Sequence, residues 1–98
     1  MALYRIVFAA DRVGQASMPP FEITVPDGYG VAARSTDLSR KIRGRIVDAL
    51  TATPAQGATD ARPVIEQHTQ VVVMLGAGQG SAYYGTTTLG AFNLYPID

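Results

Sequence analysis

The chain has 98 residues, a formal net charge of zero and no cysteine. A hydrophobic fraction of 47% with 16% charged residues is typical of a globular protein and excludes a disordered chain, and the lack of cysteine excludes disulfides and thiolate metal sites. The first ten residues lack the basic segment and cleavage site of a secretory signal, and no apolar run approaches the ~20 residues of a membrane helix. We therefore expect one soluble domain, residues 1–98, with a cytoplasmic or virion location.

Two strand patterns open the chain. Residues 3–10 are almost continuously apolar with Arg5 as their only charge, which predicts a central strand covered on both faces. Residues 21–25 alternate apolar and polar, which predicts a strand with its odd-numbered residues on the core face. Residues 11–20, which end in a proline pair, are expected to form a loop.

A helix pattern follows a turn at Pro26-Asp27-Gly28. Residues 29–33 suggest a short return strand, and from residue 35 the apolar residues recur every three or four positions, which predicts a helix of roughly 15 residues. The helix should end near residues 51–54, with Ser35, Thr36 or Asp37 as its N-cap. We attribute Gly44 within this helix to close packing on a sheet.

The C-terminal half has a loop and strand composition. Residues 53–62 are expected to form a loop, and residues 64–75 one strand or a broken pair in which 71–75 are buried. Residues 86–95 should form the last strand, with a bulge at Gly90 and a stop at Pro96.

The order strand, strand, helix, strand, strand predicts an α+β fold, with a mostly antiparallel sheet of four to five strands and one main helix packed on one face. Residues 21–50, a strand followed by a helix with Thr36-Asp37-Leu38 and Lys41-Ile42, are similar to the ubiquitin-like β-grasp pattern. This likeness covers about a third of the chain. The final residues lack the paired glycines that conjugation uses.

Residues 71–82 form an apolar run that breaks into Gly76, Gly78 and Gly80, which resembles the strand and phosphate loop of a nucleotide-binding unit. Such a loop needs a helix behind its glycines, because the helix N-terminus binds the pyrophosphate. Residues 83–89 are instead aromatic and β-branched. The glycines are therefore expected to link two strands.

A basic cluster lies in residues 34–45. Its cations outnumber Asp37 by five to one, a local charge of +4 that the rest of the chain balances with three arginines against seven acids; the cluster comprises Arg34, Arg40, Lys41, Arg43 and Arg45. Such a cluster can attract an acidic protein partner. Nucleic acid is not expected, because no aromatic residue lies among the cations to stack on a base.

His68 is the only histidine, and on a strand it would share one side with Glu66. If the protein were an enzyme, these two residues would be its acid–base pair. A metal needs at least a third ligand, and with no cysteine and no second histidine this would have to be a carboxylate or come from another subunit, so we expect neither a metal nor a cofactor. The serines show no nucleophile motif.

Residues 76–94 contain no charged residue. A strand without charge at a sheet edge needs a cover, and a second copy of the chain would provide one, so we expect a homo-oligomer. The contact or ligand residues would be the three glycines of this stretch with Tyr83, Tyr84 and Thr87. In a strand the two tyrosines would face opposite ways.

The sequence therefore favours a small non-catalytic assembly module, which self-associates and belongs to a multiprotein complex or a phage particle. The alternative is a small oligomeric enzyme or ligand-binding protein with a pocket between subunits around His68.

Overall fold

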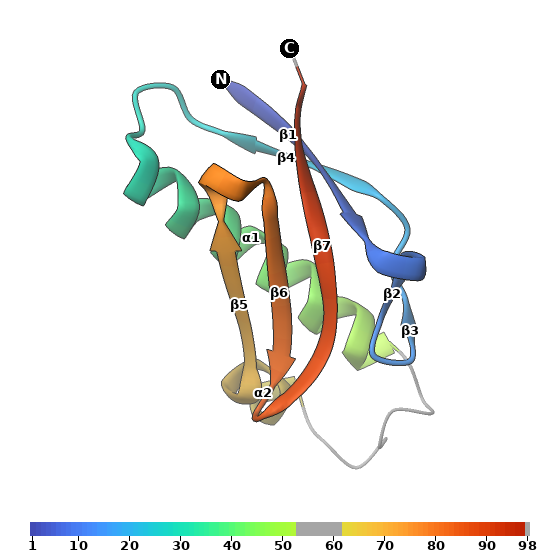
Figure 1. The fold of residues 1–98 in the computed structure, drawn as a ribbon. Helices are drawn as coiled ribbons and strands as arrows, with labels where there is room; N and C mark the ends of the chain where they lie inside the picture. Colours follow the sequence, from blue (N-terminus) through green and yellow to red (C-terminus); the bar gives the residue numbers. More distant parts are fainter. Residues whose placement is uncertain (53–61, 98) are drawn as a thin grey trace.

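A computed structural model describes residues 1–52 and 62–97. Its main elements, shown in Figure 1, are β1 (Ala2–Phe8), β4 (Phe21–Val25), α1 (Val31–Ala52), α2 (Arg62–His68), β5 (Thr69–Met74), β6 (Gln79–Tyr84) and β7 (Thr87–Ile97). The smaller elements are two 3-10 turns, η1 (Ala9–Asp11) and η2 (Leu75–Ala77), and the short strands β2 (Arg12–Val13) and β3 (Ala16–Ser17). Most of the loop predicted at 53–62, namely residues 53–61, lies outside the described residues.

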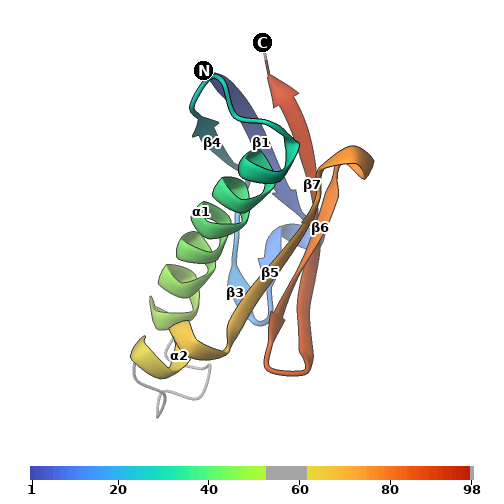
Figure 2. The ribbon, with the colours of Figure 1, turned by 90° about the vertical axis from the view of Figure 1, so that its left-hand side faces the viewer.

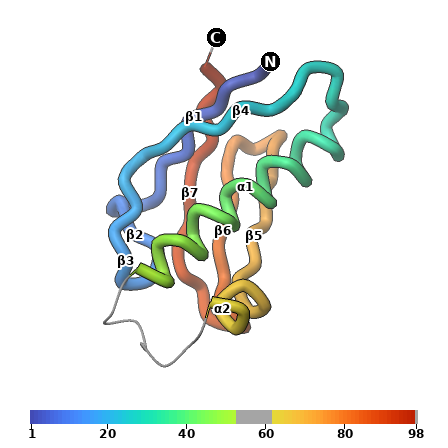
Figure 3. The backbone as a smooth tube through the Cα atoms, turned by 180° about the vertical axis from the view of Figure 1, so that it is seen from behind, coloured from blue at the N-terminus to red at the C-terminus, as the bar shows by residue number. Residues whose placement is uncertain are grey.

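The five long strands form one antiparallel sheet in the order β4-β1-β7-β6-β5. Helix α1 lies across one face of this sheet, as the side view of Figure 2 and the rear view of Figure 3 show. The predicted α+β class, with one main helix on one face, is confirmed. The sheet has one strand more than the predicted order, because β6 is a strand of its own.

Strands β1 and β4 form the first pair of the sheet. The alternation predicted for β4 is confirmed, since Phe21, Ile23 and Val25 are buried. Strand β1 lies between β4 and β7, as a central strand should. It is not covered on both faces, however: Arg5 is exposed, because no helix of the described residues packs on that side.

Helix α1 is longer than its pattern predicted. It begins at Val31 and has 22 residues, so the predicted return strand at 29–33 and the predicted N-caps at 35–37 are wrong. The apolar stripe is buried as expected, through Leu38, Ile42, Ile46 and Leu50. Gly44 is exposed, and a Cβ placed on it would meet no atom within 4 Å, so close packing does not explain this glycine.

Residues 62–68 form a helix, α2, where the sequence predicted the start of a strand. Proline suits the first turn of a helix, because the N–H that it lacks has no acceptor there, and Pro63 lies in that turn. Ile65 is the one buried residue of α2. The side chain of Thr69 then donates to the carbonyl of Ile65 at 2.6 Å, where the chain passes into β5.

The glycine-rich segment joins β5 to β6, as predicted, because these strands pair with each other. Gly78 ends η2 in the left-handed region at φ 67°. Strand β7 then runs to Ile97, beyond the stop predicted at Pro96. The register against β6 shifts near Ala82 and Tyr83, which places the irregularity beside Gly90.

Residues 11–20 contain more structure than the predicted loop. Strands β2 and β3 pair as a short ribbon, and Val13 and Ala16 within it are buried. The amide of Gly14 donates to the carbonyl of Leu89 at 2.8 Å, which fixes the ribbon against β7. The segment therefore closes part of the core.

Candidate functional site

Side chains of α1 bind carbonyl groups on both edge strands of the sheet. Lys41 donates from Nζ to the carbonyl of Thr24 on β4, at 2.7 Å. On the opposite edge, Ser39 donates to the carbonyl of Val71 at 2.9 Å, and Arg43 donates from Nε to the carbonyl of Thr69 at 2.9 Å. Exposed edge carbonyls invite pairing with other chains. These bonds cover carbonyls on β4 and β5 that such pairing would use.

The other members of the basic cluster also have intramolecular contacts. The guanidinium of Arg34 donates from Nη1 to the Tyr4 hydroxyl at 3.2 Å, and the guanidinium carbon of Arg45 lies 4.6 Å from the centre of the Phe21 ring. Arg40 pairs with Asp37 at 2.6 Å. The predicted basic cluster is thus divided among separate contacts along α1.

Asp37 is the buried acid of the helix and holds two cations. Its Oδ2 lies 2.7 Å from Lys41 Nζ, and its Oδ1 lies 2.6 Å from the Arg40 guanidinium. The hydrogen bond from Lys41 lowers the pKa of the Asp37 carboxyl; burial opposes this effect, and Arg40 adds to it. Asp37 therefore neutralises the middle of the basic cluster.

The structure separates the predicted His68–Glu66 pair. Both residues lie on α2, and residues two positions apart on a helix do not face each other. The Glu66 carboxylate accepts from Arg62 Nε at 3.0 Å. His68 Nδ1 lies 2.9 Å from the carbonyl of Val64, and its exposed ring stacks on Tyr84 with 5.5 Å between the centres. The strand geometry that suggested acid–base work is therefore absent.

The tyrosines of β6 face opposite sides of the sheet, as predicted. Tyr84 stacks on His68, on the side of the helices. Tyr83 pairs in register with Gln70 and belongs to the other face. Thr87 pairs with Tyr84, so it lies on the same side as the helices.

The three glycines Gly76, Gly78 and Gly80 lie in different parts of the segment from η2 to β6. Gly76 is exposed in η2. Gly78 accepts from the amide of Leu94 at 2.8 Å through its carbonyl. Gly80 is buried in β6, where it pairs with Phe92. The glycines therefore shape the β5–β6 connection, and strand β6 follows at the place where a phosphate loop has its helix.

The charge-free stretch does not form a sheet edge. Strands β6 and β7 lie inside the sheet, with β7 between β1 and β6. The edge-strand reason for predicting a homo-oligomer is therefore wrong. The edges are β4 and β5, where side chains of α1 bind carbonyls.

The face of the sheet turned away from α1 is the one large surface that the described helices leave uncovered. We call it the outer face; pairing in register places on it Leu3, Arg5, Val7, Glu22, Thr24, Gln70, Val72, Met74, Gln79, Ser81, Tyr83, Thr88, Ala91, Asn93, Tyr95 and Ile97. Its charged side chains are Arg5 and Glu22, which pair with each other at 3.1 Å. The outer face is thus nearly free of unpaired charge.

Three large apolar side chains stand about half exposed on the outer face: Val72 at 49%, Met74 at 50% and Tyr95 at 49%. The exposure of Val72 and Met74 corrects the prediction that residues 71–75 are buried, and no sequence prediction concerned the exposure of Tyr95. The polar residue Gln70 carries the one available signal, since residues 70, 72 and 74 share one face of a strand, while Val71 to Met74 are all apolar and show no alternation.

The described residues include no group of three or more histidines or acids placed to hold a metal ion. None of the described helices has both the length and the apolar character needed to cross a membrane. Neither a protein-family model, nor a curated protein, nor a solved structure matches this chain.

Proposed function

We propose that this chain is a non-catalytic assembly module that self-associates through its outer face. The observation that carries the proposal is the half-exposure of Val72, Met74 and Tyr95. The two charged side chains of the same face, Arg5 and Glu22, pair with each other. Large apolar side chains exposed on one uncovered face are typical of protein contact surfaces.

The extent of the outer face suits a stable dimer. Five strands at ~4.8 Å spacing and about six residues at ~3.4 Å give a plane of roughly 24 by 20 Å, or about 500 Å². The side chains that stand on this plane add accessible surface. The face therefore approaches the ~600 Å² per partner at the lower end of standard interfaces.

A second copy of the chain is the occupant that the charges favour. A partner selected by charge would meet only the Arg5–Glu22 pair, which is already neutral. In an isologous dimer each apolar side chain contributes to the interface twice. Ser81 and Ala91, which pair on neighbouring strands of this face, are small enough to let two sheets approach closely.

Covered edges support contact through the face rather than through strand pairing. Pairing at β5 would require the carbonyls of Thr69 and Val71, which accept from Arg43 and Ser39. Contact through the outer face leaves these bonds in place.

The test compares the oligomeric states of two lysine variants, Val72→Lys on the outer face and Val64→Lys on α2. Val64 is 39% exposed and lies on a helix, so it provides a matched control. Sedimentation equilibrium should give twice the 10.4 kDa chain mass for the wild type and for Val64→Lys. Val72→Lys should weaken the dimer by about tenfold or more, because the contact desolvates an unpaired ammonium.

A wild-type chain that remains monomeric at about 1 mM would contradict self-association at any useful affinity. A dimer that Val64→Lys and Val72→Lys weaken equally would contradict the outer face as its interface.

A further inference from the structure

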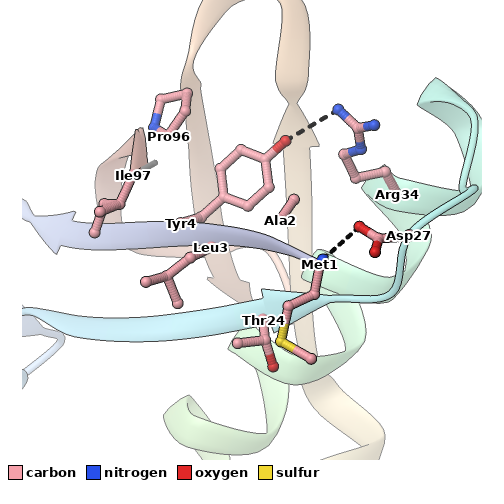
Figure 4. Close-up of a pocket in the computed structure, with 9 residues that line it drawn as sticks. All are labelled: Met1, Ala2, Leu3, Tyr4, Thr24, Asp27, Arg34, Pro96 and Ile97. Carbon is pink, nitrogen blue, oxygen red and sulfur yellow. Dashed lines mark hydrogen bonds and ion pairs between the residues drawn. The ribbon is translucent and has the colours of Figure 1, made fainter.

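A hollow of about 600 Å³ lies where β1 begins and β7 ends, beside the start of α1 and away from the centre of the outer face. Figure 4 shows its lining, which combines apolar side chains with a tyrosine and an arginine: Met1, Ala2, Leu3, Tyr4, Thr24, Asp27, Arg34, Pro96 and Ile97. This volume lies within the ~300–1,000 Å³ range of small-molecule sites.

Arg34 lines this hollow without an acidic partner among the described residues. Its guanidinium donates to two neutral acceptors, the Tyr4 hydroxyl and the carbonyl of Tyr29, both at 3.2 Å. Its Nε is buried and donates to no acceptor in the described part of the chain. Asp27, the acid of the hollow, instead pairs with the Met1 ammonium at 2.5 Å. The partly buried cation therefore retains unused donors.

Tyr4 provides a second donor at the same place. The residue is only 5% exposed, and its hydroxyl oxygen accepts from Arg34. A phenol that accepts one hydrogen bond keeps its own O–H free to donate. Figure 4 shows the Tyr4 ring between Arg34 and Pro96, so an apolar surface adjoins the two donors.

We propose that this hollow binds a carboxylate attached to an apolar group. A planar carboxylate accepts two parallel hydrogen bonds from a planar guanidinium, and this match of geometry favours a carboxylate as the ligand of Arg34. Each Nη nitrogen of Arg34 carries two N–H groups and donates one of them within the chain, so one carboxylate oxygen accepts from the second N–H of an Nη nitrogen and the other from the other Nη nitrogen or from the Tyr4 hydroxyl. The apolar group lies against the Tyr4 ring, Ala2 and Pro96. The carboxylate belongs to a free organic acid or to the C-terminus of a peptide.

The test is a titration of the full chain with hexanoate, followed through the amide and arginine Nε–H signals in NMR spectra. Hexanamide has nearly the same shape without the charge and serves as the ligand control. Arg40→Gln serves as the protein control, because Arg40 lies on the same helix, pairs with the Asp37 carboxylate and does not line the hollow. Acetyl-Ala-Ala-Leu and its amide distinguish a peptide C-terminus from a free acid.

Hexanoate should bind the wild type and Arg40→Gln with saturation and should shift the Arg34 Nε–H signal. Arg34→Gln should weaken binding by about tenfold or more, and Tyr4→Phe by a smaller factor, because charge-assisted hydrogen bonds are stronger than neutral ones. Tyr4→Phe removes only a hydroxyl, so it tests the site even if Arg34→Gln fails to fold. Tighter binding of acetyl-Ala-Ala-Leu than of hexanoate identifies a peptide terminus as the source.

Three results would overturn the proposal. Hexanoate that does not saturate the wild type, hexanamide that binds equally well, or Arg40→Gln that weakens binding as much as the hollow variants would each show that the site does not recognise a carboxylate. Sedimentation of the same samples keeps this test separate from self-association.

Discussion

Replacing Gly80 with alanine tests the closest approach within the sheet. A Cβ at this position would lie 2.3 Å from Cζ of Phe92 and 2.5 Å from the carbonyl oxygen of Val72. Phe92 is 2% exposed and belongs to the core, and Val72 O is backbone of the neighbouring strand. The φ of Gly80 lies outside the left-handed region, so alanine would be disfavoured by space alone.

The loss of unfolding free energy in Gly80→Ala depends on which neighbouring atoms must move to make room for the Cβ. Overpacking of a core costs about 1–3 kcal/mol, and complete removal of a buried phenylalanine costs about 3–5 kcal/mol. Because the Phe92 ring can turn partly aside while the β5 backbone cannot, we expect Gly80→Ala to lower the free energy of unfolding by about 2–4 kcal/mol. For a domain of this size, that loss corresponds to a fall in Tm of roughly 10–30 °C.

Gly44→Ala is the matched control, since a Cβ at this exposed position of α1 would meet nothing within 4 Å. It should raise the free energy of unfolding by about 0.5–1 kcal/mol. Urea and thermal unfolding, followed by circular dichroism, measure both variants. Adding Phe92→Leu to Gly80→Ala should cost less than the two single losses together, because the smaller side chain relieves part of the clash. A neutral Gly80→Ala would refute the packing described for β6.

Two further predictions concern the helix contacts. Arg43→Met removes the donors to the carbonyls of Thr69 and Glu66, so it should destabilise the fold by about 1–3 kcal/mol and increase light scattering on heating. Arg40→Met should cost less than about 1 kcal/mol, because the Arg40 side chain is exposed and Asp37 keeps its ion pair with Lys41. Equal effects in unfolding and scattering assays would show that the edge carbonyls need no cover. Asp37 has a pKa lowered below 3.8 in the folded chain by Lys41 and Arg40, so its contribution to stability is complete above the unfolded value and declines as the pH falls through the folded value. Thermal unfolding from neutral pH to about pH 2 should therefore show a steeper acid loss for the wild type than for Asp37→Asn, and parallel curves would contradict this role.

The regular parts of the fold could be predicted because periodicity reports burial. The period of two in 21–25 and the apolar stripe from Leu38 to Leu50 each correspond to a buried face. The start of α1 was not predictable in the same way. Residues 31–34 precede the stripe and are mostly exposed, so they carry no periodic signal. Helix α2 was missed because Ile65 alone of its residues is buried, and one apolar position defines no period.

Strand β6 shows a different limit. Its inward positions include Gly80 and Ala82, which give almost no hydrophobic signal, although both are buried. The space above them is filled from β7, since Phe92 pairs with Gly80 and lies next to its absent side chain. When side chains of a neighbouring strand fill the space on the core face, the strand itself needs only small residues there. Its sequence then resembles a glycine-rich loop.

The basic cluster shows why charge along a sequence does not locate a charged surface. The sequence records the cations Lys41 and Arg43 but not the carbonyl groups of Thr24 and Thr69 to which they donate, because every residue carries the same carbonyl. Because α1 lies across the sheet between its two edge strands, Lys41 and Arg43 reach backbone carbonyls on those strands. This use of the cations can be seen in the folded structure but not in the sequence. The consequence for recognition is a division of the molecule. Side chains of α1 that bind the sheet edges lie on the helix side, the nearly uncharged surface is the outer face, and Arg34 lines a hollow at the end of the sheet with neutral acceptors on its guanidinium.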